Sequence, residues 1–302
     1  MSRAYRVALL GNGIKPSLSP ALHMEEARHL GLDYEYRIVD LIDRADVDLG
    51  AELRRLEDAG FAAANVTHPF KQSVLEHVQH PSPTVRRLGS ANLVLFDRGQ
   101  DAQHGHGRTA HNTDRTGFGT ALEGFLAQNA AVAATSTVLQ VGAGGAGAAT
   151  ASALLDLGFG RIVVHDVVEA AVGALLGRLG DAAGEGPARL RSAGGSLDDW
   201  LPRVDGVVHV TPVGMAEHPG IAFDVDRLSR GAWVAEVVYR PLETELVRRA
   251  RARGLATLDG GGMAVGQAVE SMRLITGLEP DVGRMHAHFR RLVGGPDAPP
   301  EA

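Results

Sequence analysis

A glycine-rich turn near the middle of the sequence constrains the fold more than any other feature. An apolar run from Thr137 ends in Gly142 and predicts a buried strand, and Ala146 to Leu157 predicts the helix that follows. Gly142, Gly144 and Gly147 form the pattern G-x-G-x-x-G. Such glycines allow a tight turn, close backbone approach to a pyrophosphate and close packing of helix on strand. The pattern therefore predicts a βαβ unit with a phosphate site at the helix N-terminus.

An acidic residue follows this turn at a useful distance. The apolar stretch 161–165 predicts a second strand, and Asp166 ends it about 20 residues after the turn, where a ribose hydroxyl would lie in a bound dinucleotide. No Arg or Lys stands close behind Asp166. A carboxylate accepts hydrogen bonds from a free ribose diol and repels a 2′-phosphate, so the pattern favours NAD over NADP. The alternative is a glycine-rich joint that binds nothing.

Length and composition exclude several classes of protein. The chain has 302 residues, 44% hydrophobic and 22% charged, which suits two soluble domains. Its net charge of −6 argues against a nucleic-acid or membrane partner. There is no cysteine, hence no disulfide, and no signal peptide or apolar stretch of membrane-spanning length is evident. We expect a cytoplasmic monomer or homodimer.

The N-terminal part carries polar residues where predicted strands end. Ser19 and Pro20 resemble an N-cap and first helical residue, and a helix start with the hydroxyls of Ser17 and Ser19 suits a carboxylate. A strand ending at Asn65 leads through Thr67 into a turn, and Pro69 predicts a helix start that would place Lys71 on the first turn. The alternatives are an ordinary cap for Ser19 and a solvated surface charge for Lys71.

The connection between the halves contains Asn112-Thr113-Asp114. Thr113 or Asp114 is expected to cap a helix running to Gln128, which would put Asp114 at a hinge, facing the ligand; a plain N-cap is the alternative.

The preceding polar hairpin or loop holds His104 and His106, with His111 nearby. No acid or thiolate completes a ligand set there, so no metal is expected.

Further buried strands are predicted at 163–165, 207–210 and 233–238, with helices between them. The fold class is therefore α/β, with a Rossmann-type doubly wound parallel sheet and an N-terminal α/β domain. We expect the domain boundaries at 1–114 with 260–302 and at 115–259. The stretch 257–263, rich in glycine, predicts a flexible joint before a helix at 264–276 that carries Gln267 on its first turn.

Taken together, these motifs resemble the shikimate dehydrogenase family over almost the full length, and within it the NAD-preferring quinate/shikimate dehydrogenases. The matching stretches are Ser17-Leu-Ser19-Pro20, Asn65-Val-Thr67-His68-Pro69-Phe70-Lys71, Asn112-Thr113-Asp114, the glycine turn, Thr211-Pro-Val-Gly214-Met215, Val238-Tyr239-Arg-Pro241 and Gln267-Ala268. Seven matches in the same order are more specific than any one of them.

The resemblance implies an NAD-dependent oxidoreductase that reversibly oxidises a ring hydroxyl of shikimate or quinate to the 3-dehydro compound. It implies that Lys71 and Asp114 form a catalytic pair beside that hydroxyl. The substrate-binding residues would be Ser17, Ser19, Thr67, Asn92, Tyr239 and Gln267. The cofactor-binding residues would be Gly142, Ala143, Gly144, Gly145, Gly147, Asp166, Thr211, Pro212, Val237 and Gly260.

Three departures from the family pattern bear on substrate choice. Gly89-Ser-Ala-Asn-Leu93 stands where Gly-Ala-Val-Asn-Thr is usual, His209-Val210 replaces a usual Asn-Ala, and unfamiliar residues flank Asp114. Three alternative functions stay open. The protein could be an enzyme for an amino-substituted analogue, a catalytically silent dinucleotide-binding regulator, or a Lys–Asp dehydrogenase that acts on a folate derivative.

Overall fold

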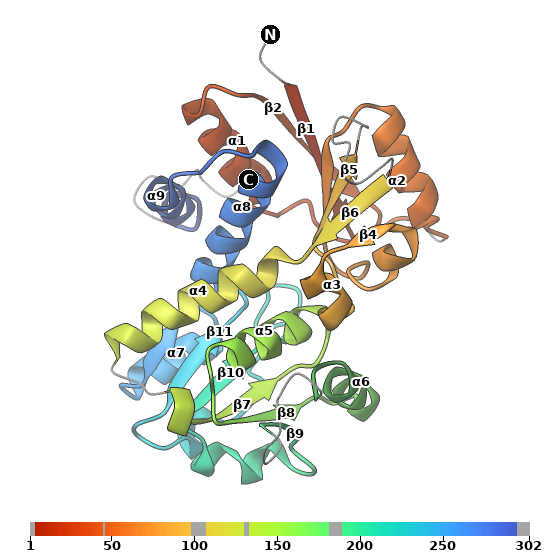
Figure 1. Ribbon diagram of the computed structural model, residues 1–302. Helices are drawn as coiled ribbons and strands as arrows, with labels where there is room; N and C mark the ends of the chain where they lie inside the picture. The colour runs from red at the N-terminus through yellow and green to blue at the C-terminus, as the bar shows by residue number, and fades with distance from the viewer. Residues whose placement is uncertain (1–3, 45, 98–106, 130–132, 181–188, 295–302) are drawn as a thin grey trace. The chain divides into compact units, whose positions relative to one another are not determined.

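The computed structural model describes residues 4–44, 46–97, 107–129, 133–180 and 189–294 (Figure 1). The chain divides into two compact units, which are residues 1–113 with 265–302, and residues 114–264. The divisions fall inside two helices, after Thr113 in α4 and after Ala264 in α8. Each unit contains one six-stranded sheet, so the predicted α/β class is confirmed.

The first unit has a mixed sheet with strand order β2-β1-β3-β5-β6-β4. Strands β1, β2 and β3 are parallel, β5 runs antiparallel to β3 and β6, and β4 is parallel to β6. Its elements are β1 (Ala4–Gly11), α1 (Ser19–His29), β2 (Asp33–Asp40), α2 (Leu49–Asp58), β3 (Ala63–Val66), η1 (Ser73–His77), β4 (His80–Pro81), α3 (Pro83–Leu88), β5 (Leu93–Asp97), β6 (Gly107–His111), most of α8 (Gly261–Thr276) and α9 (Val282–Leu292).

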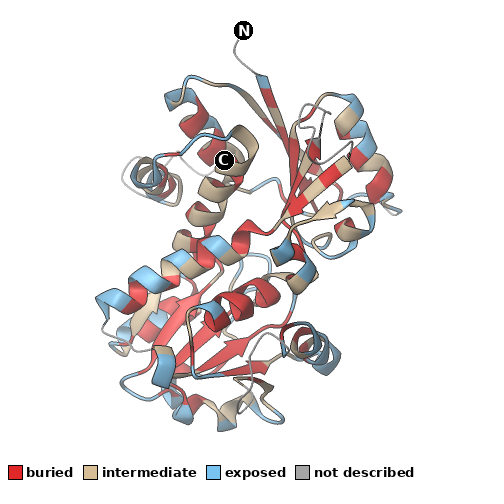
Figure 2. Ribbon diagram, viewed as in Figure 1, coloured by how far each residue is buried: buried red, intermediate tan, exposed pale blue. Residues whose placement is uncertain are grey.

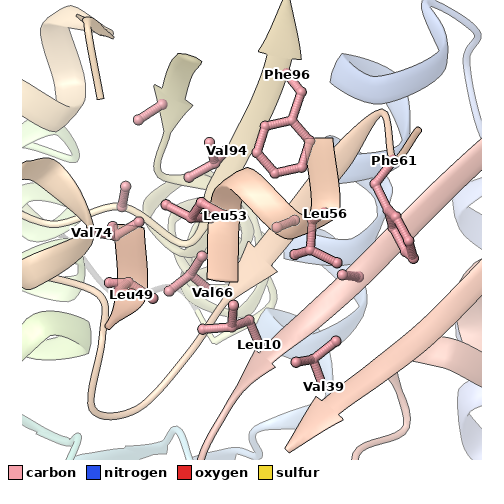
Figure 3. Close-up of a cluster of buried hydrophobic side chains, with 14 of the residues drawn as sticks. Leu10, Val39, Leu49, Leu53, Leu56, Phe61, Val66, Val74, Val94 and Phe96 are labelled. Atoms are coloured by element: carbon pink, nitrogen blue, oxygen red, sulfur yellow. The ribbon is translucent and has the colours of Figure 1, made fainter. Parts of the chain in front are cut away.

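One face of this sheet packs on α2. Figure 3 shows Leu49, Leu53 and Leu56 of the helix pointing toward side chains of the sheet, among them Leu10 and Val66. The three leucines recur at the helical spacing of three to four residues, which gives α2 its apolar side. The helix begins where the Asp48 carboxylate accepts the N–H of Ala51 at 2.8 Å.

The second unit contains a fully parallel sheet with strand order β12-β11-β10-β7-β8-β9. This is the predicted doubly wound arrangement, and the strand order changes direction between β7 and β10. Its elements are α4 (Thr113–Gln128, from Asp114), η2 (Ala133–Thr135), β7 (Thr137–Val141), α5 (Gly145–Asp156), β8 (Arg161–His165), α6 (Glu169–Leu179), β9 (Leu190–Ser192), η4 (Leu197–Asp199), η5 (Leu201–Arg203), β10 (Gly206–His209), η6 (Val225–Arg227), β11 (Trp233–Glu236), α7 (Glu245–Ala252), β12 (Ala256–Leu258) and the first turn of α8.

Burial in this unit follows from the two-sided covering of a parallel sheet. Figure 2 shows β7, β8, β10 and α5 coloured mainly as buried, and the residues of β10 and β11 are buried throughout. Helix α5 is rich in alanine, and these small side chains allow it to lie close to the strands. Continuous apolar strands are typical of sheets that are covered on both faces.

Two predicted elements were wrong. No α-helix starts at Pro69; the N–H of Phe70 donates to the Thr67 carbonyl at 2.8 Å and closes a turn, which a short 3₁₀ helix at Ser73 follows. The stretch 257–263 is also no flexible joint. It contains the end of β12 and the start of α8, and Gly260 between them packs tightly against neighbouring backbone.

Among the described residues, no helix combines the length and apolar character needed to cross a membrane. The C-terminal tail from residue 295 lies outside the described residues, as do His104 and His106. Within the described part, no cluster of His, Cys, Asp and Glu has the arrangement of a metal site.

Candidate functional site

The glycine turn after β7 has the close backbone contacts that its spacing predicts. Gly142 has φ of +117°, and a methyl group on its Cα would lie 2.5 Å from the Val210 carbonyl oxygen. A methyl group on Gly147 would lie 2.6 Å from the carbonyl oxygen of Gly142. Both distances are shorter than carbon–oxygen contact allows, so only glycine fits at either position. The turn is thereby held against the end of β10 and the start of α5.

A buried side chain that the sequence interpretation overlooked stabilises this turn. Gln140 of β7 is fully buried, and its Nε2 donates to the carbonyl oxygens of Gly142 and Gly147, both at 2.9 Å. Its Oε1 accepts the hydroxyl of Thr150 on α5 at 2.9 Å. The sequence signal that could have identified Gln140 is a lone amide inside an otherwise apolar strand, two residues before the first glycine.

The turn opens onto the start of α5. Gly144 precedes the helix at the N-cap position and has no side chain that could cap the first turn. A methyl group on Gly144 would meet nothing within 4 Å, so the backbone is accessible on that side. Accessible helix N–H groups with their positive dipole suit a phosphate.

Asp166 lies beside the same turn, at the end of β8. Its Oδ2 accepts the N–H of Ala143 at 2.7 Å and its Oδ1 accepts the N–H of Val168 at 2.9 Å. The carboxylate therefore links the glycine turn to the end of β8, and its unused lone pairs can accept further donors. Val167, directly after it, is 94% exposed and places an apolar side chain beside the acid.

The remaining predicted cofactor residues follow the carboxyl ends of β10, β11 and β12. Thr211 and Pro212 come after β10, Val237 comes after β11, and Gly260 comes after β12. A methyl group on Gly260 would lie 2.5 Å from the carbonyl oxygens of Val237 and Val238, so glycine is required here for close approach. All the predicted cofactor residues thus lie at one edge of the second sheet.

A buried acid connects two of these strand ends. Glu236 is 2% exposed and its Oε1 accepts the backbone N–H groups of Val237 at 2.9 Å and Val238 at 3.0 Å. The same oxygen lies 2.9 Å from Nδ1 of His209, and Oε2 accepts the hydroxyl of Thr244 at 3.0 Å. Thr244 in turn caps α7. The sequence alone marked His209 as a departure from the family pattern, but it predicted no role for His209 or Glu236. The signal that could have identified Glu236 is an acid at the end of a buried strand.

In the first unit, α1 begins differently from the prediction. Ser19 is the first helical residue and not the N-cap; its N–H donates to Oγ of Ser17 at 3.3 Å. The preceding loop is held by Asp40, whose carboxylate accepts the N–H groups of Gly13 at 2.9 Å and Ile14 at 3.0 Å. Burial raises the pKa of Asp40, but these backbone donors outweigh it and the pKa lies below its ordinary value. Both serines are half-buried at the helix start.

Thr67 and Lys71 lie at the end of β3, beside the end of β1. The N–H of Thr67 donates to the Leu10 carbonyl at 2.9 Å, and a methyl group on Gly11 would collide with the Thr67 side chain. Lys71 lies in the turn that follows, half-buried, with its carbonyl accepting the N–H of Ala91 at 2.8 Å. The lysine is therefore fixed by a turn, and not by the predicted helix.

Asn92 precedes β5, whose start lies beside the end of β3 because the two strands are antiparallel. Its Oδ1 accepts the N–H of Thr113 at 2.7 Å and its Nδ2 donates to Oγ1 of Thr113 at 2.9 Å. The first N–H of α4 is thus bound by Asn92, where the sequence had predicted a cap from Thr113 or Asp114. Ser90, one of the unusual residues, is fully buried and accepts a hydrogen bond from Asn112.

Three more predicted residues have these positions. Asp114, 5% exposed, lies on the first turn of α4 in the second unit, and Tyr239 is half-buried after β11 in the same unit. Gln267 belongs to the first unit, on the second turn of α8 and not the first, because the helix starts at Gly261. It lies four residues before Ser271, and hence on the same helix face. Ser271 donates to or accepts from Thr113 at 3.2 Å.

The geometry of the second unit is suited to binding a dinucleotide. A turn that excludes side chains, accessible N–H groups at a helix start and an acid at the end of the next strand match the requirements of a pyrophosphate and a ribose diol.

Comparison with known proteins identifies the family to which the chain belongs. The family model described as "Shikimate dehydrogenase substrate binding domain" matches residues 9–94. The chain is 48% identical to a shikimate dehydrogenase (NADP(+)) of Streptomyces avermitilis over 294 residues, which covers 96% of this chain and 97% of the relative. The chain belongs to the shikimate dehydrogenase family.

Other members of this family are nearly as similar. A quinate/shikimate dehydrogenase (NAD(+)) of Corynebacterium glutamicum is 41% identical over 297 residues, covering 97% of this chain and all of the relative. The solved structure of quinate dehydrogenase from Corynebacterium glutamicum in complex with NAD has a TM-score of 0.84 at 40% identity, covering 96% of this chain and 99% of that one. The chain is thus an NAD(P)-dependent dehydrogenase by family, as predicted.

Proposed function

We propose that the protein catalyses the reversible oxidation of a ring hydroxyl of shikimate or quinate with NAD as hydride acceptor. The observation that carries this proposal is identity of 41–48% over nearly the whole chain to dehydrogenases named for these substrates. The polar residues at the strand ends of both units support it, because they supply carboxylate, hydroxyl and dinucleotide ligands of the required kinds.

The preference for NAD over NADP rests on the end of β8. The relatives differ in this respect, since the Streptomyces enzyme is named for NADP(+) and the Corynebacterium enzyme for NAD(+). In this chain Asp166 is followed by two exposed valines, Val167 and Val168, and offers a carboxylate where a 2′-phosphate would require a cation. This arrangement favours the free ribose diol of NAD.

We assign substrate binding to the first unit. Ser17 and Ser19 at the start of α1 would bind the ring carboxylate, since hydroxyls and helix N–H groups there are suited to an anion. Thr67, Asn92 and Gln267 would bind ring hydroxyls. Tyr239 of the second unit is proposed as a further substrate-binding residue, and the cofactor residues at the carboxyl edge of its sheet would hold NAD.

Lys71 and Asp114 are proposed as the catalytic residues. Oxidising a secondary alcohol requires removal of the hydroxyl proton while hydride leaves, and the reverse reaction requires a proton donor at the ketone oxygen. An ammonium group can exchange that proton and stabilise negative charge developing on the oxygen, and a neighbouring carboxylate can hold it in place. A cytoplasmic location and a monomeric or homodimeric state stay predictions.

A spectrophotometric panel tests the proposed reaction. The purified protein would be assayed with NAD and NADP against shikimate, quinate and an amino-substituted analogue. We expect turnover of shikimate or quinate, with kcat/KM higher for NAD. Faster turnover of the amino analogue would identify that alternative enzyme, and binding of NAD without turnover of any substrate would identify the regulator.

Substitution of Lys71 tests the catalytic assignment. We expect Lys71→Ala to lower kcat by roughly a hundredfold or more, because proton transfer is lost, while NAD affinity is unchanged. Lys71→Arg is the matched control for charge: it keeps the cation but cannot exchange a proton near neutral pH, so it should stay slow. Near-normal turnover of Lys71→Ala would remove Lys71 from the mechanism.

A further inference from the structure

A hydroxyl, an imidazole and a carboxylate follow one another at the carboxyl edge of the second sheet. Oγ1 of Thr211 lies 2.6 Å from Nε2 of His209, and Nδ1 of the same ring lies 2.9 Å from Oε1 of Glu236. The side chains of His209 and Glu236 are 1% and 0% exposed, so water does not compete for these hydrogen bonds. The three residues therefore form one connected chain from the buried core to the end of β10.

The carboxylate end of this chain fixes which way the hydrogen bonds point. Oε1 of Glu236 also receives the backbone N–H groups of Val237 and Val238, which can only donate. An oxygen that meets two backbone donors is an acceptor, so the third partner must donate to it as well. Nδ1 of His209 therefore carries the proton, and in the neutral ring Nε2 is left as an acceptor.

The hydroxyl end then has a defined polarity. In the part of the chain that the structure describes, the hydrogen-bond partners of Thr211 Oγ1 are Nε2 of His209 and the N–H of Val213, the latter at 3.2 Å. The N–H can only donate, so the hydroxyl proton goes to Nε2. One lone pair of Oγ1 accepts from Val213, and the other stays available to a ligand.

The position of Thr211 makes that lone pair useful. A methyl group on Gly142 would lie 3.1 Å from Cγ2 of Thr211, so this side chain lies directly beside the glycine turn. The two residues follow β7 and β10, the neighbouring strands between which the strand order changes direction. Ligands of doubly wound sheets bind at this point.

We propose that His209 and Glu236 are positioning residues that fix Thr211 Oγ1 as a hydrogen-bond acceptor for the bound dinucleotide. The donor on the dinucleotide is either the carboxamide NH₂ of the nicotinamide or a ribose hydroxyl. This inference rests on the proposed NAD-dependent function. It gives a role to His209, one of the residues in which this chain departs from its family pattern.

The protonation of His209 can be measured without any ligand. Protein labelled with ¹⁵N-histidine would be studied by two-bond ¹H–¹⁵N correlation, with His209→Asn used to assign the ring. We expect a pyridine-like Nε2 and a pyrrole-like Nδ1 for His209 in the parent protein. A protonated Nε2, in either the other tautomer or the charged ring, would overturn the proposal, because Thr211 would then be free to donate.

The acceptor role is tested by equilibrium binding measured by calorimetry. Thr211→Val removes the hydroxyl at constant shape, and we expect its Kd for NAD to rise roughly three- to tenfold, the effect of one neutral hydrogen bond. Thr211→Ser should restore the parent affinity. Unchanged NAD affinity in Thr211→Val would overturn the proposal, and circular dichroism would check that each variant is folded.

Repeating the titration with 3-acetylpyridine adenine dinucleotide identifies the donor. This analogue has a methyl group in place of the carboxamide NH₂. If Thr211→Val weakens the binding of NAD but not that of the analogue, the carboxamide is the donor. If it weakens the binding of both equally, a ribose hydroxyl is the donor. The parent protein failing to bind NAD at all would contradict the proposed function, whereas the ¹⁵N result would still decide the polarity of Thr211.

Discussion

Each unit buries a polar cluster at the end of its central strands, and the two clusters differ in charge. In the first unit the members are amides and hydroxyls: Asn65, 5% exposed, bonds the hydroxyl of Tyr36 at 2.9 Å and that of Ser271 at 3.1 Å. In the second unit the cluster is built around the carboxylate of Glu236 and the ring of His209.

The difference shows how charge limits a buried cluster. Amides and hydroxyls both donate and accept, so the first cluster can satisfy its members in more than one pattern. A carboxylate only accepts, so every partner of Glu236 must donate and the whole pattern is fixed. The second cluster therefore gives a defined polarity to the neighbouring ligand residues, at the cost of a buried charge.

The strongest test of this contrast is Glu236→Ala. It leaves several buried donors without an acceptor, and we expect the free energy of unfolding to fall by about 3–5 kcal/mol. Urea denaturation measures this change. The matched control is Glu243→Ala, since Glu243 is 63% exposed in its ion pair with Arg251. This substitution should lower the free energy of unfolding by less than about 0.5 kcal/mol. A small loss for Glu236→Ala would show that the buried charge is dispensable.

The corresponding change in the neutral cluster is Asn65→Ala. It removes the bonds to Tyr36 and Ser271 and one to the Asn92 carbonyl. We expect a loss of about 2–3 kcal/mol, smaller than for Glu236→Ala because the partners are neutral and can rearrange. The same denaturation experiment measures it. A loss equal to that of Glu236→Ala would remove the distinction between the clusters.

His23 provides the next test, since no carboxylate is hydrogen-bonded to this buried ring in the part of the first unit that the structure describes. Nδ1 lies 3.0 Å from the Tyr34 hydroxyl, Nε2 has no hydrogen-bond partner among the described residues, and burial lowers the pKa of His23 to about 3. The unfolded chain takes up the proton near pH 6.5 while the folded state does not, so stability is present above that pH and is lost as pH falls.

We expect this loss to reach about 2 kcal/mol at pH 5, at roughly 1.4 kcal/mol per pH unit. The free energy of unfolding of the parent minus that of His23→Gln, measured from pH 8 to pH 5, isolates the effect because glutamine does not titrate. A difference that is constant with pH would show that His23 can be protonated in the folded protein.

The smallest effect is expected for Ser90→Ala. Nδ2 of Asn112 donates to the Ser90 carbonyl at 3.1 Å and to its Oγ at 3.3 Å, so the carbonyl remains as an acceptor after substitution. The loss of stability should stay below about 1 kcal/mol. A larger loss in thermal or urea unfolding would mean that the Ser90 carbonyl alone does not satisfy the Asn112 side chain.

The sequence by itself determined the features that depend on residues close together in the chain. The glycine turn with Gly142 and Gly147, the acid at Asp166 and the doubly wound parallel class of the second sheet follow from local spacing and apolar patterning, and the structure confirms them. Local steric and hydrogen-bond requirements leave few alternatives at such positions.

Only the tertiary structure decided which polar groups meet. Asn92 binds the first N–H of α4 from 21 residues away, and Asn65 reaches Ser271 across 206 residues. Gly260 suggested flexibility, but backbone carbonyls from another strand end surround it. A buried polar atom must find some partner, and only the packing of distant segments determines which one it finds.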